Sequence, residues 1–396
     1  MTEPFRRFRL VRKQRESDVI TSFYLAATDD APLWPARPGQ YLTLRIPGPA
    51  GPVLRTYSIS NPVDAGDVYR ISVKREAGAN GAPDGVGSVW LHDNLHEGDE
   101  IEVAAPRGAF FLDEDSTRPV LLLAGGVGLT PLLSMLHRLA AEGERPVWMV
   151  HASENGAVQA LRGEMVELAA ASGGRIRYTG VLRNPGDGDH AAGIVDAQGV
   201  VDRPLLQRLL PLDDYQVYLC GPQPFMVAMW RLLTDMGIAP ERIAYEFFGP
   251  GASLPALAAK LDAAPARDLP RIPANAPKSL SRLDFLTDPD QRAVAGPAPR
   301  HTAVAASASA AAGDEVVFAR SGLTLAWNSG VDSILELAES AGLDPAFVCR
   351  SGICGSCKSG LTEGEVEYFS DPLDPPGPGE ALICCSRPRG RVVLDL

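Results

Sequence analysis

Residues 349–357 read CRSGICGSC, and the rest of the chain is best interpreted from this stretch. Its three cysteines stand at C-x4-C-x2-C spacing, and a further pair, Cys384 and Cys385, follows near the end of the chain. Four of the six intervening residues are Gly or Ser, so the backbone can curl closely around a compact group and turn its N–H groups towards negative charge. Thiolates at this spacing are typical of a plant-type [2Fe-2S] cluster.

The alternatives are a zinc site and buried free thiols. Zinc-binding cysteines usually come as two close pairs, whereas the first gap here is four residues long. Cys384 and Cys385 are neighbours on a strand predicted over ALICCS, so their side chains point to opposite faces and one of them ligates the metal. The spacing alone leaves open which of the two it is.

Composition narrows the class of protein. With 396 residues the chain is long enough for two or three cores, and a net charge of -12 argues against a nucleic-acid partner. Five of the six cysteines fall in the last 48 residues, which indicates a metal framework in place of disulfides. The N-terminus has no apolar core of secretory length, and the longest uncharged run, 120–136, is broken by glycines and a proline. We expect a cytoplasmic monomer without a membrane span.

Hydrophobic periodicity divides the chain. Short alternating segments from residue 5 to about 112 predict a small antiparallel β-barrel. From residue 119, buried apolar runs alternate with helical patterns, which predicts a doubly wound α/β domain. Residues 250–313 hold 19 Ala and 9 Pro, as a linker would. The predicted domains are 1–115 (barrel), 116–249 (α/β), 250–313 (linker) and 314–396 (cluster domain).

Two turns of the α/β domain are candidate ligand sites. The loop AGGVGLTP, 124–131, follows a buried strand and opens a helix, so its backbone N–H groups can approach a pyrophosphate. It is not a standard G-x-G-x-x-G, and tight strand-to-helix turns often require glycine for packing alone. The segment CGP, 220–222, ends a predicted central strand at the edge where α/β sheets bind ligands.

The order of the motifs along the chain resembles that of a known family. LRTYSIS (54–60) resembles the R-x-Y-S flavin signature of the ferredoxin reductase superfamily, and PGQYL, ISVKRE, GSVWLHD, GGVGLTP, YLCGPQPFM and YEFFGP are similar to the reductase module of flavohaemoglobins. The C-terminal part resembles plant-type ferredoxin domains fused to flavin reductases of the phthalate dioxygenase reductase type. These resemblances imply a multidomain protein with a flavin-binding antiparallel β-barrel, a nicotinamide-binding α/β domain and an α+β (β-grasp) ferredoxin domain.

The same resemblance implies roles for individual residues. Arg55 would offer its guanidinium to the flavin phosphate, Ser58 would hydrogen-bond near flavin N5, and Cys220 would lie beside the nicotinamide. Ser58, Cys220 and Glu246 are the expected catalytic residues. The expected cofactor-binding residues are Tyr41, Arg55, Thr56, Tyr57, Ser58, Gly87, Ser88, Gly125, Gly126, Val127, Gly128, Leu129, Thr130, Cys220, Gly221, Pro222, Phe247, Phe248 and Gly249. The expected metal ligands are Cys349, Cys354, Cys357 and Cys384, which leaves Cys385 as a core residue.

The chain is therefore expected to be an oxidoreductase that passes electrons from NADH or NADPH through a flavin to a [2Fe-2S] cluster and on to a partner protein. The resemblance favours FAD, with FMN as the alternative. We expect the acceptor to be a Rieske-type or related oxygenase. Two other functions stay open, a self-contained diaphorase or ferric or quinone reductase, and a redox-sensing [2Fe-2S] docking protein.

Overall fold

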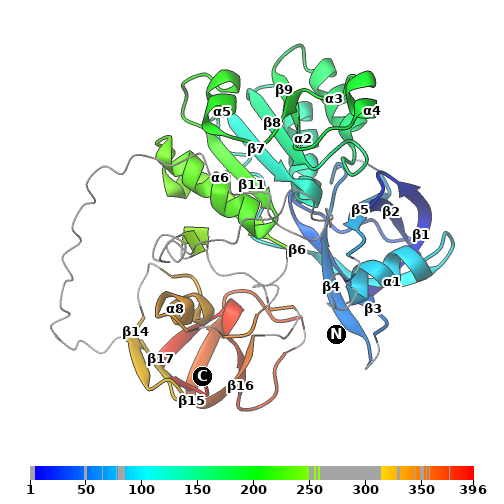
Figure 1. The fold of residues 1–396 in the computed structure, drawn as a ribbon. Helices are drawn as coiled ribbons and strands as arrows, with labels where there is room; N and C mark the ends of the chain where they lie inside the picture. Colours follow the sequence, from blue (N-terminus) through cyan, green and yellow to red (C-terminus); the bar gives the residue numbers. More distant parts are fainter. Residues whose placement is uncertain are drawn as a thin grey trace. The chain divides into compact units, whose positions relative to one another are not determined.

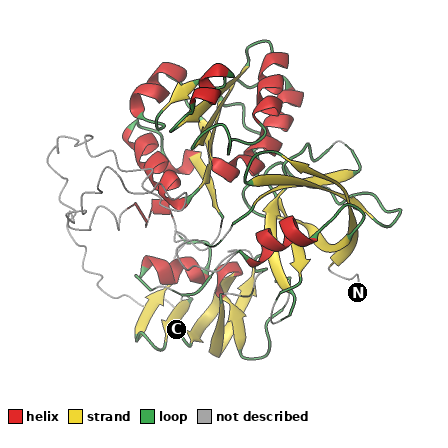
Figure 2. Cartoon of the chain, turned by 45° about the vertical axis from the view of Figure 1, so that its right-hand side comes forward, coloured by secondary structure: helices red, strands yellow, loops and turns green. Residues whose placement is uncertain are grey.

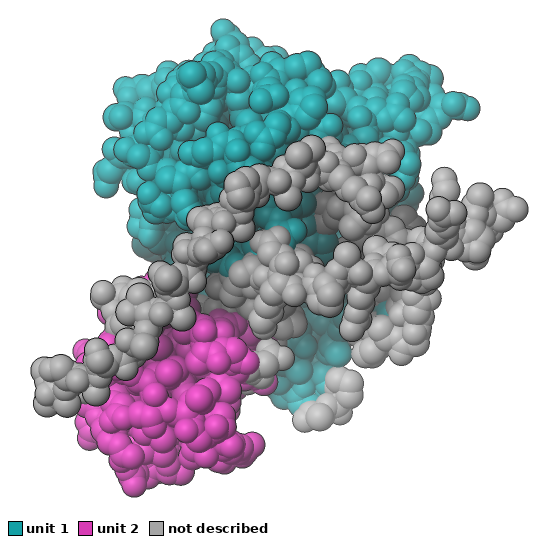
Figure 3. Space-filling model, turned by 60° about the vertical axis from the view of Figure 1, so that its left-hand side comes forward, with its two compact units in different colours: residues 1–281 teal, residues 282–396 magenta. Residues whose placement is uncertain are grey.

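The computed structural model consists of two compact units, residues 1–281 and residues 282–396 (Figure 3). It describes residues 5–48, 51–64, 66–76, 78, 85–248, 254, 255, 257, 258, 314–327, 331–343, 345–347, 352, 353, 355, 357–373 and 375–396. Three predicted site residues, Gly249, Cys349 and Cys354, and most of the predicted linker lie outside these ranges. The domain boundaries given above therefore stay a prediction.

The first unit begins with a six-stranded antiparallel sheet in the order β4-β3-β6-β1-β2-β5. Its elements are β1 (Phe5–Arg15), β2 (Ile20–Ala27), β3 (Tyr41–Ile46), β4 (Val53–Ser58), β5 (Val68–Lys74), α1 (Val86–Asn94) and β6 (Glu100–Arg107). A bridge between Ile59, just after β4, and Ile71 on β5 joins the two ends of the sheet. Alternate apolar side chains such as Phe8 and Leu10 point inward and are fully buried. The predicted β-barrel is confirmed.

A six-stranded parallel sheet follows, in the order β10-β9-β8-β7-β11-β12. Its elements are β7 (Val120–Gly125), η1 (Gly126–Gly128), α2 (Leu129–Glu142), β8 (Val147–Ser153), α3 (Arg162–Ala171), β9 (Ile176–Leu182), α4 (Asp187–Ala191), β10 (Ala197–Gln198), α5 (Arg203–Leu209), β11 (Gln216–Gly221), α6 (Gln223–Asp235), η2 (Pro240–Arg242) and β12 (Ile243–Phe247). Helices cover both faces of this sheet (Figure 1). The predicted doubly wound α/β domain is confirmed.

The order of these strands fixes where a ligand can bind. The chain runs outward from β7 through β8 and β9, and then returns to place β11 on the other side of β7. Crevices at the carboxyl ends of strands on either side of such a reversal are where open α/β sheets bind ligands. The two turns singled out from the sequence, 124–131 and 220–222, lie at the ends of β7 and β11 at this position.

The second unit contains a five-stranded mixed sheet in the order β14-β13-β17-β15-β16, visible with its helix in Figure 2. Its elements are β13 (Glu315–Phe318), β14 (Leu323–Ala326), α8 (Ile334–Ser340), β15 (Lys358–Tyr368), β16 (Glu380–Leu382), η4 (Ile383–Cys385) and β17 (Ser386–Leu394). Strand β13 is parallel to β17, and the other pairs are antiparallel. This α+β arrangement confirms the predicted class of the cluster domain.

One local prediction is wrong. The segment ALICCS does not form a continuous strand, because β16 ends at Leu382 and residues 383–385 form a 3-10 turn. Cys384 and Cys385 are both buried, and the argument from opposite strand faces does not apply to them. Among the described residues, no helix has the length and apolar character needed to cross a membrane.

Candidate functional site

The predicted flavin residues of the barrel gather around the start of α1. A Cβ built on Gly87 would lie 2.6 Å from Cγ of Arg55 and 2.8 Å from the hydroxyl of Tyr57. Only a glycine lets the helix begin this close to the two side chains. Next to it, the hydroxyl of Ser88 accepts a hydrogen bond from the backbone N–H of Glu76 at 3.1 Å. Residues from β4 and from α1, about 30 positions apart in sequence, therefore lie in close contact.

Ser58 is the last residue of β4 and pairs with Tyr41 of β3. Both residues are buried, and Tyr41 packs against Gly108, where a Cβ would lie 2.9 Å from its ring. Thr56 lies between Arg55 and Tyr57 on the same strand and is partly buried. Burial raises the pKa of Tyr57, so its hydroxyl stays protonated. The barrel thus offers hydroxyl groups and one guanidinium, a set that suits a phosphorylated cofactor.

The two turns at the strand reversal are packed directly on each other. A Cβ on Gly128 would lie 2.3 Å from the carbonyl oxygen of Cys220, and a Cβ on Gly221 would lie 3.0 Å from the backbone of Gly125. Gly126 has a φ of +54°, and its Cβ position is open. Glycine is therefore needed at 125, 128 and 221 for packing between the turns, and at 126 for the left-handed backbone.

The structure also places the other predicted residues of these two turns. The hydroxyl of Thr130 donates to the carbonyl of Val127 at 3.1 Å, and Leu129 is fully buried at the start of α2. Pro222 precedes α6 and is exposed. The structure therefore brings residues 125–130 and 220–222 together, although they are about 90 positions apart in sequence.

The Gly128→Ala substitution is expected to destabilise the first unit by about 1–3 kcal/mol, because the added methyl meets a backbone carbonyl that cannot move aside. Urea unfolding followed by far-UV circular dichroism measures the change. Gly188→Ala is the matched control, since Gly188 lies in α4 and nothing lies within 4 Å of its Cβ position. Equal unfolding midpoints for the two variants would contradict the packing argument.

His151 on β8 forms a hydrogen bond to the glycine-rich turn and was not among the residues predicted from the sequence. Its side chain is fully buried, and Nε2–H donates to the carbonyl of Gly126 at 3.0 Å. Burial lowers its pKa to about 4, so the ring is neutral. Among the described residues its Nδ1 has no hydrogen-bond partner. A histidine inside the apolar run VWMVHAS is the signal that could have found it, because buried polar groups need partners.

Cys220 and Glu246 face each other on neighbouring strands. They are directly paired in the parallel register of β11 and β12. Glu246 as a residue is partly exposed, but its Oε2 is buried and has no hydrogen-bond partner within the described part of the chain. Desolvation raises the pKa of Glu246 to about 8. Burial, and next the charge of Glu246, raises the pKa of the Cys220 thiol, so the thiol stays neutral.

Glu246→Gln is expected to gain stability relative to the natural protein as the pH rises from about 4.5 to about 8. In this window the unfolded carboxyl loses its proton while the folded carboxyl keeps it, which favours unfolding of the natural protein. Below pH 4.5 both states bind the proton and the difference is constant. Urea midpoints of both proteins at pH 4.5, 6 and 9 measure the effect. A difference independent of pH would contradict the raised pKa.

Two of the predicted cluster ligands, Cys357 and Cys384, lie in contact in the second unit. The Sγ atoms of Cys357 and Cys384 are 2.9 Å apart, and the backbone N–H of Gly352 donates to Sγ of Cys384 at 3.4 Å. The thiol of Cys385 instead donates to the carbonyl of Leu382 at 3.6 Å. Two adjacent sulfurs with an N–H pointing at one of them suit an iron–sulfur cluster. This geometry favours Cys384 over Cys385 as the fourth ligand.

The fold and these sites define an oxidoreductase with the architecture of the ferredoxin reductase superfamily, joined to a plant-type ferredoxin domain. Three family models match successive parts of the chain. They are described as oxidoreductase FAD-binding domain (residues 7–112), oxidoreductase NAD-binding domain (122–231) and 2Fe-2S iron-sulfur cluster binding domain (317–389). These matches support FAD, NAD(P)H and a [2Fe-2S] cluster as the cofactors.

Curated relatives match the first part of the chain. The flavohemoprotein of Halalkalibacterium halodurans is 39% identical over 253 residues, which are 63% of this chain and 61% of the relative. That of Bacillus thuringiensis subsp. konkukian is 43% identical, over 63% of this chain and 62% of the relative. The chain thus spans about three fifths of the length of these relatives.

Solved structures match the same part of the chain and, in one case, nearly all of it. The FAD/NAD-binding domain of nitric oxide dioxygenase from Vibrio cholerae is 34% identical with a TM-score of 0.55, over 62% of this chain and 99% of that domain. Phthalate dioxygenase reductase, described as modular for electron transfer from pyridine nucleotides to [2Fe-2S], is 26% identical with a TM-score of 0.52. This second match covers 99% of this chain and 98% of that reductase.

Proposed function

We propose that the protein is an NAD(P)H-dependent reductase that passes electrons through FAD to its [2Fe-2S] cluster and then to a partner protein. The observation that carries the proposal is the presence of all three binding modules, in order, in one chain that matches phthalate dioxygenase reductase from end to end. When bound, the flavin accepts a hydride from the nicotinamide and releases electrons singly, as the cluster requires. The residues of the chain bind the nicotinamide nucleotide and the flavin, and they align the two with each other.

In the barrel, Arg55 binds the flavin phosphate through its guanidinium, and Ser88 with the backbone at Gly87 supports the same phosphate. Tyr57 packs on the cofactor, and the hydroxyl of Ser58 hydrogen-bonds near flavin N5. The close packing at Gly87 supports these assignments, because it places Arg55 and Tyr57 together next to the start of α1. Thr56 and Tyr41 complete the barrel side of the site.

In the α/β domain, the turns 125–130 and 220–222 bind the nicotinamide nucleotide at the strand reversal. Cys220 orients the nicotinamide as a neutral thiol. Glu246 keeps a proton near neutral pH because its pKa is about 8. Phe247 and Phe248 follow it and cover the flavin ring, a role supported by the 45% exposure of Phe248.

In the second unit, Cys349, Cys354, Cys357 and Cys384 hold the cluster. The acceptor is a protein, and we propose an oxygenase of the Rieske or a related type. The name of phthalate dioxygenase reductase, which has the same modules, supports an oxygenase. Residues 315–396 carry 12 Asp and Glu against 6 Lys and Arg, so a basic docking face on the partner fits. We place the protein in the cytoplasm as a monomer.

The test is anaerobic mixing of the purified, FAD-loaded protein with NADH and, separately, NADPH, followed by addition of cytochrome c. We expect loss of flavin absorbance, then of cluster absorbance, then steady reduction of cytochrome c. A protein that binds a cluster but oxidises neither nucleotide would favour the redox-sensing alternative. Reduction of quinones or ferric iron without any use of the cluster would favour the diaphorase alternative.

A further inference from the structure

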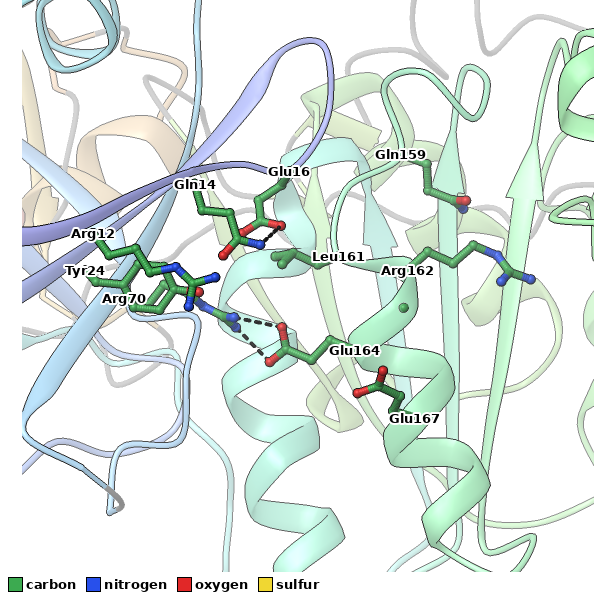
Figure 4. A pocket seen from close by; sticks show the side chains of 11 residues that line it. Arg12, Gln14, Glu16, Tyr24, Arg70, Gln159, Leu161, Arg162, Glu164 and Glu167 are labelled. Atoms are coloured by element: carbon green, nitrogen blue, oxygen red, sulfur yellow. Dashed lines mark hydrogen bonds and ion pairs between the residues drawn. The ribbon is translucent and has the colours of Figure 1, made fainter. Parts of the chain in front are cut away.

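A largely buried ion pair joins the barrel to the α/β domain within the first unit. The guanidinium of Arg70 on β5 donates to both carboxylate oxygens of Glu164 on α3, at 2.7 and 2.9 Å. The Arg70 side chain is 7% exposed and that of Glu164 is 24% exposed. Figure 4 shows the two groups pointing at each other across the junction. Such a two-pronged pair fixes direction as well as distance.

On the barrel side, Arg70 also holds the segment that follows Ser58. Its Nε donates to the hydroxyl of Ser60 at 3.1 Å, and its Nη2 donates to the Ser60 carbonyl. The backbone N–H of Arg70 in turn donates to the side chain of Asn61 at 2.7 Å. The guanidinium is therefore tied to a residue only two positions beyond the hydroxyl proposed to contact flavin N5.

On the other side, Glu164 is tied to α2, the helix that starts at the glycine-rich turn. Its Oε1 lies 2.5 Å from Nε2 of His137. A second link runs parallel to this one, because the hydroxyl of Ser134 on α2 donates to the carbonyl of Asn61 at 3.1 Å. A continuous set of hydrogen bonds thus connects the flavin-side strand to the nicotinamide-side helix.

Ile20 of β2 packs into the apolar core of the α/β domain, but the region beside the pair is lined mainly by polar side chains. A cavity of about 570 Å³ lies there, lined by residues of β1, β2, β5 and α3 (Figure 4). Four buried polar atoms of its lining have no partner within the described residues. They are Gln14 Oε1, Glu16 Oε1, Gln159 Oε1 and Arg162 Nε. Because this part of the interface is polar and not closely filled, the direct bonds across it restrict how the two domains are aligned here.

We propose that Arg70 and Glu164 are positioning residues that hold nicotinamide C4 in line with flavin N5. The inference rests on the proposed function, since it concerns the hydride transfer of that reaction. The pair touches neither reacting group and acts through Ser60 on one side and through His137 on the other. Loss of the pair leaves each ligand its own binding residues but removes one of the constraints on their mutual orientation.

The experiment is stopped-flow reduction of the FAD-loaded full chain by NADH or NADPH, whichever the natural protein uses. Glu164→Gln removes the charge at nearly constant volume, and Arg70→Lys keeps the charge but loses the fork. We expect both variants to reduce the flavin about 10- to 100-fold more slowly. FAD content and the dissociation constant of the oxidised nucleotide should change less than about 2-fold, because the binding residues are intact.

Asp196→Asn is the matched control. Its partner Arg162 also lies on α3, at 2.9 Å, but both residues belong to the α/β domain and the pair does not cross to the barrel. We expect its reduction rate to stay within about 2-fold of the natural protein. Glu164→Asp is a further test, because it keeps the charge but is one methylene shorter. If the pair positions the two groups, this variant reduces the flavin slowly. If the pair acts only through its charge, the variant keeps the natural rate.

The possible outcomes distinguish a failure of the proposed function from a failure of the positioning inference. If the natural protein is not reduced by either nucleotide, the proposed function fails. If it is reduced, and the Glu164→Gln and Arg70→Lys variants keep its rate, the positioning inference fails while the function stands. Loss of FAD from both variants also overturns the inference, because the pair would then serve assembly of the barrel. Equal slowing by Asp196→Asn overturns it as well.

Discussion

Cys384→Ser is expected to abolish the [2Fe-2S] cluster, and Cys385→Ser is expected to leave it in place. The two residues are adjacent and equally buried, so the comparison isolates metal ligation from packing. Cys384 lies 2.9 Å from the sulfur of Cys357 and receives the N–H of Gly352. Cys385 donates to the Leu382 carbonyl, and a serine hydroxyl can make the same bond.

Iron content and the visible absorption of the purified variants measure this prediction. We expect cytochrome c reduction by Cys384→Ser to fall at least about 100-fold, because the cluster needs four ligands. Ferricyanide reduction by the flavin, which does not pass through the cluster, should stay within about 2-fold. A cluster that survives Cys384→Ser and disappears in Cys385→Ser would assign the fourth ligand to Cys385.

Cys220→Ala is expected to slow reduction of the flavin by about 100-fold without loss of FAD. Cys220 is fully buried at the end of β11, where its carbonyl packs on Gly128. Burial keeps its thiol protonated, so its contribution is position and not nucleophilic attack. Removing the sulfur leaves space in which the nicotinamide can settle away from the flavin.

Single-turnover reduction with saturating nucleotide separates this effect from binding. Cys220→Ser, which keeps the size of the side chain, is the matched control and should retain more of the rate than the alanine variant. Its hydroxyl can also donate a hydrogen bond. An unchanged rate in Cys220→Ala would remove Cys220 from the site.

Much of the fold could be predicted from local patterns. Alternating residues in segments such as FRLVRK match a barrel with one buried face, and continuous apolar runs such as VLLLAG match parallel strands covered on both faces. The turns at 125–130 and 220–222 could be placed together because carboxyl ends of parallel strands share one edge. The packing of Gly128 on Cys220 explains why glycine occurs there at all.

Other features could not be predicted because they depend on tertiary contacts. ALICCS has the apolar composition of a strand, yet the chain turns at residues 383–385. The partner of Arg70 lies 94 positions away on a helix of another domain, and nothing in YRISVKR indicates it. His151 is similar, since its bond to Gly126 appears only when β8 and the glycine-rich turn are folded side by side.

The strand order has a consequence for biosynthesis. Strand β7 pairs with β11 only after 96 further residues have been made, counting from Val120 to its partner Gln216. At ribosomal rates of about 5–20 residues per second, one edge of the apolar strand VLLLAG waits roughly 5–20 s for its neighbour. Nascent chains that end before residue 216 present this edge permanently, so they are expected to aggregate or to recruit chaperones.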